Sequence, residues 1–120
     1  MNYLLILDDT RSVEDVKNIS PEPFKLYPEL PIVVALDFKN AQQIMLKSEG
    51  LCEHVCFDHN LYGSKNHMDL TGADFANWLD HHDHNRKQMT AIGCTYSVHT
   101  TDEKGAAEIR DAMDLYKEIK

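Results

Sequence analysis

Short, continuously apolar runs alternate with segments of helical pattern along this chain, and that alternation restricts the fold more than any other feature. The apolar runs cover residues 3–7, 31–37, 54–58 and 91–98. They are apolar throughout rather than at every second position, so we expect strands that are buried on both faces by helices. The sequence therefore predicts an α/β fold of three layers, with a mainly parallel sheet of about four strands.

The length of 120 residues and the hydrophobic content of 42% fit one folded domain spanning residues 1–120. No apolar run approaches the roughly 20 residues that a membrane-spanning helix needs. The first residues lack a basic region, and Asp8 and Asp9 interrupt the first apolar run, so we expect no signal peptide. Three cysteines cannot all pair with one another, which favours a reduced, cytoplasmic protein.

The net charge of -8 argues against an extended nucleic-acid-binding surface, because contacts to many phosphates need clustered lysine and arginine. A small phosphorylated ligand, or the phosphate at one end of a nucleic acid, stays compatible with this charge. A bound cation would offset part of the acidic charge locally.

Four residues are expected to cap helices through their side chains, namely Ser12, Asn40, Thr71 and Asp102. The helix after Asn40 should run to Lys47, and the apolar residues of the last helix repeat as far as Tyr116. Residues 20–31 contain all four prolines and predict an irregular connection.

Polar clusters stand at the ends of three apolar runs: Asp8-Asp9-Thr10-Arg11, Asp58-His59-Asn60 and His99-Thr100. The carboxyl ends of parallel strands share one edge of a sheet, and ligands bind in the crevice there. These side chains should therefore converge on one acidic, polar site that suits a divalent metal and a phosphate group.

The carboxylates of Asp8, Asp9 and Asp58 are the expected metal ligands, because Mg²⁺ and Mn²⁺ prefer oxygen donors. The alternative is that these aspartates only form turns and cap helices. Packed carboxylates repel one another in the absence of a metal, so at least one of them should have a raised pKa.

His59 and His99 are the candidates for proton transfer, because histidine titrates near neutral pH. Their alternative role is structural hydrogen bonding. Arg11, Thr100 and Lys104 are candidates for holding phosphate oxygens, although such residues are ordinarily just solvated.

Two further segments are candidates for sites. Cys52, His54 and Cys56 would share one face of a strand, but no second pair of ligands accompanies them, so a structural zinc site is not expected. The loop over residues 61–70 is either a flap that covers the substrate or an ordinary surface loop.

Taken together, four motifs resemble those of the cyclic-phosphate-processing receiver domains, which are small relatives of the receiver domains of response regulators. The motifs are Asp8-Asp9-Thr10-Arg11, Asp58-His59, Thr71-Gly72 before a helix, and His99-Thr100 followed by Gly105. The resemblance extends from Tyr3 to about Ile109. It implies a receiver-like, flavodoxin-like fold and a metal-assisted phosphoesterase. The substrate implied is a cyclic or terminal phosphate, such as a 2′,3′-cyclic phosphate at a damaged RNA end or a cyclic nucleotide.

The resemblance also implies roles for particular residues. Asp58, His59 and His99 would be catalytic; Asp8, Asp9 and Asp58 would hold Mg²⁺ or Mn²⁺; Arg11, Asn60, Thr71, Gly72 and Thr100 would contact the substrate. Lys104, in the first turn of the last helix, is a further candidate for substrate contact from its position alone. The chain departs from the family pattern at three positions. Asn60 replaces the second aspartate of Asp-His-Asp, Thr100 replaces serine, and Tyr62 separates Leu61 from Gly63.

Two other functions compete with the phosphoesterase. Asn60 favours a module that binds a nucleotide without turnover. Receiver-type signalling would instead make Asp58 a phosphoacceptor, but signalling receivers carry a lysine after a fifth strand, and no fifth strand is evident after residues 91–98. The phosphoacceptor switch therefore ranks below the enzyme.

Overall fold

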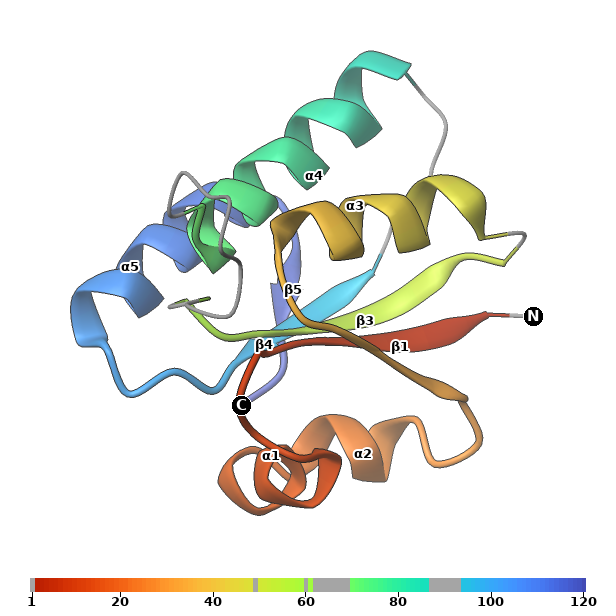
Figure 1. Ribbon diagram of the computed structural model, residues 1–120, viewed down its shortest axis with the longest axis vertical. Coiled ribbons are helices and arrows are strands. Elements are labelled where there is room, and N and C mark those ends of the chain that lie inside the picture. Colours follow the sequence, from red (N-terminus) through yellow and green to blue (C-terminus); the bar gives the residue numbers. More distant parts are fainter. Residues whose placement is uncertain (1, 49, 60, 62–69, 87–93) are drawn as a thin grey trace.

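The computed structural model describes residues 2–48, 50–59, 61, 70–86 and 94–120. Five parallel strands form one sheet, with α3, α4 and α5 on one face and α1 and α2 on the other (Figure 1). The strands are β1 Tyr3–Leu7, β2 Ile32–Ala35, β3 Cys52–Phe57, β4 Thr95–Val98 and β5 Lys117–Glu118. The helices are α1 Val13–Ile19, α2 Glu22–Leu26, α3 Phe38–Lys47, α4 Gly72–Arg86 and α5 Glu103–Ala112. The predicted three-layer, flavodoxin-like α/β fold is confirmed.

The strand order is β2-β1-β3-β4-β5, with all neighbours parallel. The connection from β1 passes through α1 and α2 on one face, whereas the connection from β3 passes through α4 on the other. The order in which strands are added to the sheet therefore reverses between β1 and β3. The carboxyl ends of these two strands flank the crevice in which ligands of such sheets bind.

Two apolar cores hold the layers together. The larger core packs β1, β3 and β4 against α3, α4 and α5, around fully buried side chains such as Phe57 and Phe75. The smaller core lies under α1 and α2 and contains Leu4, Ile6 and Val16. All five residues of β1 are buried, which explains why its sequence is continuously apolar.

The expectation of about four strands was one too few. The fifth strand, β5, has only two residues, Lys117 and Glu118. Both are polar, so there is no apolar run from which the strand could be predicted. The last helix ends at Ala112, with Met113 as its C-cap, rather than continuing to Tyr116. Part of the predicted strand over 91–98 lies outside the described residues, and the strand is seen from Thr95 onward.

Three of the four expected caps are confirmed. Ser12 forms a capping box with Asp15, Thr71 does so with Asp74, and Asp102 accepts from the backbone N–H of Gly105. The expectation for Asn40 was wrong: α3 begins earlier, at Phe38, and Asp37 caps it by accepting from the N–H of Asn40.

The proline-rich connection contains a short helix, α2, which was not expected. Pro21 is its N-cap and Pro23 lies in its first turn, where the missing N–H of proline is not needed.

The expectation that Cys52, His54 and Cys56 share one strand face was also wrong. An irregularity between Tyr3 and Leu4 shifts the register of β1 against β3, so that Tyr3 lies opposite Cys52 but Leu4 lies opposite His54. Cys52 therefore faces the larger core, whereas Cys56 faces the smaller one. All three cysteines are buried thiols, and within the described parts of the chain no helix is long and apolar enough to cross a membrane.

Candidate functional site

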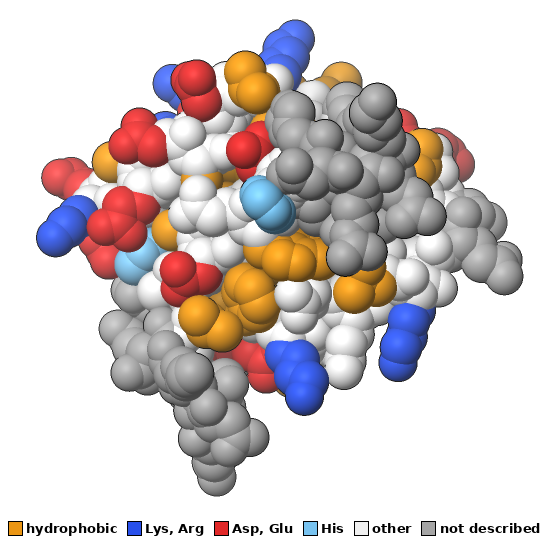
Figure 2. All heavy atoms as spheres, turned by 90° about the horizontal axis from the view of Figure 1, so that it is seen from above, with side chains coloured by type: hydrophobic (Ala, Val, Ile, Leu, Met, Phe, Trp, Pro, Cys, Tyr) orange, Lys and Arg blue, Asp and Glu red, His pale blue; other side chains and the backbone are white. Residues whose placement is uncertain are grey.

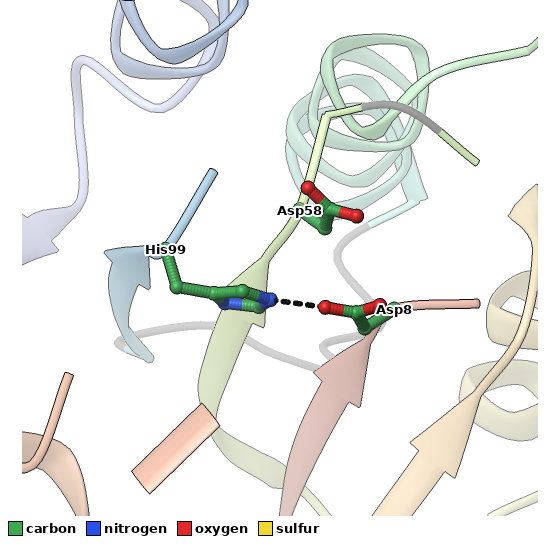
Figure 3. Close-up of side chains that lie close together, drawn as sticks. All are labelled: Asp8, Asp58 and His99. Atoms are coloured by element: carbon green, nitrogen blue, oxygen red, sulfur yellow. Dashed lines mark hydrogen bonds and ion pairs between the residues drawn. The ribbon is translucent and has the colours of Figure 1, made fainter. Parts of the chain in front are cut away.

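Side chains from the ends of three adjacent strands meet at the carboxyl edge of the sheet. Asp8 follows β1, Asp58 follows β3 and His99 follows β4 (Figure 3). Their candidate ligand atoms all lie within 4.8 Å of one another. The residues are 0%, 5% and 1% exposed, respectively, so they form a buried polar cluster rather than a solvated surface. We call these three residues the strand-end cluster.

Asp8 is the most heavily hydrogen-bonded member of the cluster. Its Oδ1 accepts from the backbone N–H groups of Thr10, at 2.9 Å, and Arg11, at 3.0 Å, as the chain turns after β1. Its Oδ2 accepts from Nε2 of His99, at 2.8 Å, and from the guanidinium of Arg11, at 3.1 Å. The turn and the two side chains together fix the carboxylate in one orientation.

Arg11 lies between the two carboxylates. Its Nη1 is 3.1 Å from Oδ2 of Asp8 and 3.5 Å from Oδ1 of Asp58. The same Oδ1 of Asp58 accepts from the backbone N–H of His59, at 2.9 Å. The predicted phosphate-binding arginine is therefore engaged with the acidic residues themselves.

The two carboxylates differ in their ionisation. Burial opposes ionisation of Asp8, but hydrogen bonds from His99, from the backbone of Arg11 and Thr10, and from the Arg11 side chain hold its pKa well below the ordinary value. Burial and the neighbouring charge of Asp8 raise the pKa of Asp58, against the opposing effects of His99 and Arg11. Asp58 is thus the member of the pair whose charge is least compensated, as expected for packed carboxylates without a metal.

The imidazole of His99 has two different sides. Nε2 faces Asp8, whereas Nδ1 is buried and has no hydrogen-bond partner among the described residues. The partnered nitrogen is therefore the one that faces the carboxylates, and Asp8 orients the ring from across β3.

The ring of His59 points toward α5, and it is not a member of the strand-end cluster. Its Nδ1 lies 3.4 Å from Oδ2 of Asp102, and its Nε2 lies 3.3 Å from Oε2 of Glu108. The ring packs on Gly105, where a Cβ atom would overlap it. Gly105 in the family motif therefore makes room for His59.

Gly72 packs against the backbone of Asp58 and His59, and Thr71 caps the helix that Gly72 begins. The Thr71 hydroxyl accepts from the N–H of Asp74, at 3.2 Å, as part of the α4 capping box. The N–H of Gly72 donates to the carbonyl of His59, at 2.8 Å, and a Cβ at Gly72 would overlap the carbonyl oxygen of Asp58. A groove of about 370 Å³ between α4 and α5 lies beside this contact, and it is lined by Thr71, Ala73, Asp74, Asn77, Glu108, Asp111 and Ala112.

The remaining predicted residues lie around the cluster. Thr100 is half-buried, and its hydroxyl accepts from the N–H of Asp102, at 3.2 Å. Lys104 is exposed in the first turn of α5, and Asp9 is half-buried beside Asp8 but does not belong to the group within 4.8 Å. Asn60 lies outside the described residues, as does most of the loop that the sequence offers as a flap.

The contact between His99 and Asp8 was not foreseen, although both residues were predicted to be at the site. The contact depends on the order of the strands, in which β1, β3 and β4 are consecutive neighbours. That order could not be read from the sequence. The other contact that was not foreseen is the position of Arg11 between Asp8 and Asp58.

The donors of the cluster fit a divalent cation. Two carboxylates suit Mg²⁺ or Mn²⁺, and an imidazole nitrogen suits Mn²⁺ better than Mg²⁺. The raised pKa of Asp58 shows that this carboxylate would gain from a positive charge beside it.

A parallel five-stranded sheet with acidic residues after its first and third strands defines a receiver-type domain. Residues 3–115 match the family described as the cyclic-phosphate processing receiver domain, and the chain therefore belongs to that family.

Two solved structures support the same fold. A CheY-like response regulator receiver domain from Methanospirillum hungatei JF-1 is 14% identical, with a TM-score of 0.53, and the alignment covers 93% of this chain and 75% of that one. The Vibrio cholerae chemotaxis protein CheY4 is 15% identical, with a TM-score of 0.57, and the alignment covers 98% of this chain and 83% of that one. A comparison with curated proteins gave no match. At such identities the likeness concerns the fold alone.

Proposed function

We propose that this domain is a metal-assisted phosphoesterase that acts on a cyclic or terminal phosphate, such as a 2′,3′-cyclic phosphate at an RNA end or a cyclic nucleotide. The contact of 2.8 Å between His99 and Asp8, beside Asp58, carries the proposal. A phosphoacceptor needs a carboxylate and a cation, but it does not need a buried imidazole oriented by a second carboxylate. That arrangement suits proton transfer.

Asp8 and Asp58 would hold a Mg²⁺ or Mn²⁺ ion, with His99 or Asp9 beside them. When bound, such an ion polarises the phosphoryl group and offsets its negative charge. Arg11 and Thr100 then hold the non-bridging oxygens, where charge concentrates.

In the proposed reaction, water adds to phosphorus, one of its protons passes to solvent, and one P–O bond of the ring breaks. Nε2 of His99 supplies the proton that the departing oxygen needs, and the product is a phosphate monoester with a free hydroxyl group. His59 supports this site through its backbone N–H, which donates to Asp58.

The charge of the molecule favours a small ligand. Figure 2 shows acidic side chains gathered over α5, at the left of that view, and Glu103, Glu108 and Asp111 are exposed on this helix. A long polyanion would be repelled by these charges, whereas a single nucleotide or a chain end need not lie along the helix. We place the reaction in the cytoplasm, where buried thiols stay reduced.

The test is incubation of the protein with a panel of 2′,3′-cyclic and 3′,5′-cyclic nucleotides in Mg²⁺ or Mn²⁺, with chromatographic detection of ring-opened products. Turnover should disappear in Asp58→Asn and persist in His81→Gln, which changes an exposed histidine on α4. Binding of the nucleotides without any opened product would overturn the enzyme and select the binding module.

A second candidate function is a phosphoacceptor switch on Asp58, and β5 is the observation that favours it. β5 runs parallel to β4 with Lys117 opposite Thr95, so the chain heads for the carboxyl edge, and Lys120 follows (Figure 1). The test is incubation with acetyl phosphate and Mg²⁺, followed by mass spectrometry. A phosphoryl group on Asp58 that is absent from Asp58→Asn would select the switch.

A further inference from the structure

The acceptor capacity of Asp8 is fully used by the protein's own donors. An ionised carboxylate offers about four lone-pair positions. The backbone N–H groups of Thr10 and Arg11 occupy Oδ1, to which the Thr10 hydroxyl also donates at 3.4 Å, and His99 and the Arg11 guanidinium occupy Oδ2. A cation that binds to Asp8 must therefore displace one of these donors.

On Oδ2, which faces Asp58 and Arg11, the guanidinium of Arg11 is the donor that is able to leave. The two N–H groups belong to the turn after β1 and move only if that turn opens. The side chain of His99 is 0% exposed and is enclosed by the fold. The side chain of Arg11 is 25% exposed, so its long, flexible stem has a route to solvent.

Charge leads to the same conclusion. Two carboxylates and one guanidinium sum to a charge of about -1 at neutral pH. A divalent cation beside the same carboxylates would lie a few ångströms from the guanidinium, and the two positive groups would repel each other strongly in this little-exposed site.

We propose that Arg11 is a built-in counter-ion: it occupies the space between Asp8 and Asp58 in the metal-free protein, and a divalent cation expels it. The proposal rests on the metal site of the proposed function. It makes the two ligands cooperative, because the expelled guanidinium is free to bind the phosphate oxygens of a substrate. Metal binding then favours phosphate binding, and by reciprocity phosphate favours metal binding.

The first test compares metal affinity by calorimetry, with Mn²⁺ and Mg²⁺ titrated into wild type, Arg11→Gln and Lys17→Gln. Lys17→Gln removes the same charge from α1, where Lys17 pairs with Glu14 and lies over Phe24. Because Arg11→Gln removes a competitor held by charge-assisted hydrogen bonds, it should bind metal roughly tenfold more tightly or better. Lys17→Gln should match wild type.

The second test follows the arginine itself in the wild-type protein and needs no substitution. The side-chain Nε resonance of Arg11 should shift during a Mg²⁺ titration, whereas that of Arg110, which is paired with Glu118, should stay in place and serves as the internal control. This measurement decides the question even if Arg11→Gln fails to fold.

The outcomes separate this inference from the metal site. Equal metal affinity of wild type and Arg11→Gln, or weaker binding by Arg11→Gln, overturns the counter-ion role and leaves the metal site in place. An unmoved Arg11 resonance in metal-saturated wild type does the same. Absence of metal binding in wild type and in Arg11→Gln overturns both proposals.

Discussion

Nε2 of His99 lies 2.8 Å from Oδ2 of Asp8, although the two residues are 91 positions apart along the chain and β3 lies between their strands. Both side chains are closed off from solvent. The contact therefore ties the ends of β1 and β4 together beside Asp58. It commits one nitrogen of the imidazole to the carboxylates and leaves the other without a hydrogen-bond partner in the described part of the chain.

Replacement of His99 by glutamine should lower kcat for opening a cyclic nucleotide by roughly 10²–10⁴-fold, which is the rate enhancement that general acid–base catalysis typically contributes. The reason is that glutamine can donate a hydrogen bond to Asp8 but cannot deliver a proton. Steady-state product formation measures the effect. His81→Gln is the matched control on α4, and a His99→Gln enzyme with wild-type kcat would remove His99 from the mechanism.

Replacement of Asp58 by asparagine should raise the thermal unfolding temperature of the metal-free protein. Burial and the charge of Asp8 raise the pKa of Asp58, so the ionised carboxylate opposes folding at neutral pH and a neutral amide does not. Metal-free stability should therefore rise, while the further stabilisation that Mn²⁺ gives to wild type should vanish.

Calorimetric unfolding with and without Mn²⁺ measures both effects. Asp114→Asn, at an exposed acid beyond α5, controls for the change in net charge. Equal stabilisation of wild type and Asp58→Asn by Mn²⁺ would place the metal elsewhere.

Gly72→Ala should destabilise the protein more than Gly105→Ala. At Gly72 the added Cβ overlaps the backbone carbonyl of Asp58, which cannot move without shifting the end of β3. At Gly105 it overlaps the ring of His59, a side chain that can rotate away at the loss of its contacts to Asp102 and Glu108. We expect about 1–3 kcal/mol of lost unfolding free energy for Gly72→Ala, typical of overpacking, and less for Gly105→Ala. Urea unfolding measures both, and the reverse order would contradict this account.

The layers and the site edge could be predicted because each depends on a local pattern. Continuously apolar runs identified β1 and β3, and their parallel arrangement placed Asp8 and Asp58 at the same edge. Strand β5 could not be predicted, since two polar residues carry no apolar signal. Helix α2 was not predicted because prolines usually indicate irregular structure, whereas the first turn of a helix tolerates them.

Side-chain directions at the site could not be predicted, because they depend on residues distant in sequence. His99 directly follows β4 and is level with Asp58, whereas His59 lies one residue further along after β3, and the two rings differ in direction. Because Gly105 has no side chain, the ring of His59 can pack against α5 at that position. The hydrogen bond to Asp8 instead keeps the ring of His99 beside Asp8 and Asp58. The position of Arg11 likewise depends on how near Asp58 comes to Asp8, which only the packed sheet determines.

The last prediction concerns pH and the buried His54. Its two ring nitrogens each lie 2.8 Å from a hydroxyl oxygen, of Thr95 and of Ser97, and burial lowers its pKa from 6.5 to about 3. In the unfolded chain His54 binds a proton below pH 6.5, whereas in the folded protein it stays neutral down to about pH 3. The unfolded state therefore binds more protons between these values, and stability rises with pH through this window and levels off above it.

Between pH 6 and pH 5 the wild-type protein should lose about 1 kcal/mol of unfolding free energy from this residue. Asp8 contributes little there because its pKa is lowered from 3.8, whereas the raised pKa of Asp58 acts in the opposite direction, since the folded protein takes up that proton more readily as the pH falls. His54→Gln should be less stable than wild type at neutral pH but should have a flatter dependence on pH. Urea unfolding at several pH values from about 5 to 7.5 measures both slopes, with His81→Gln as the exposed control, and parallel slopes for wild type and His54→Gln would show that His54 is not the group responsible.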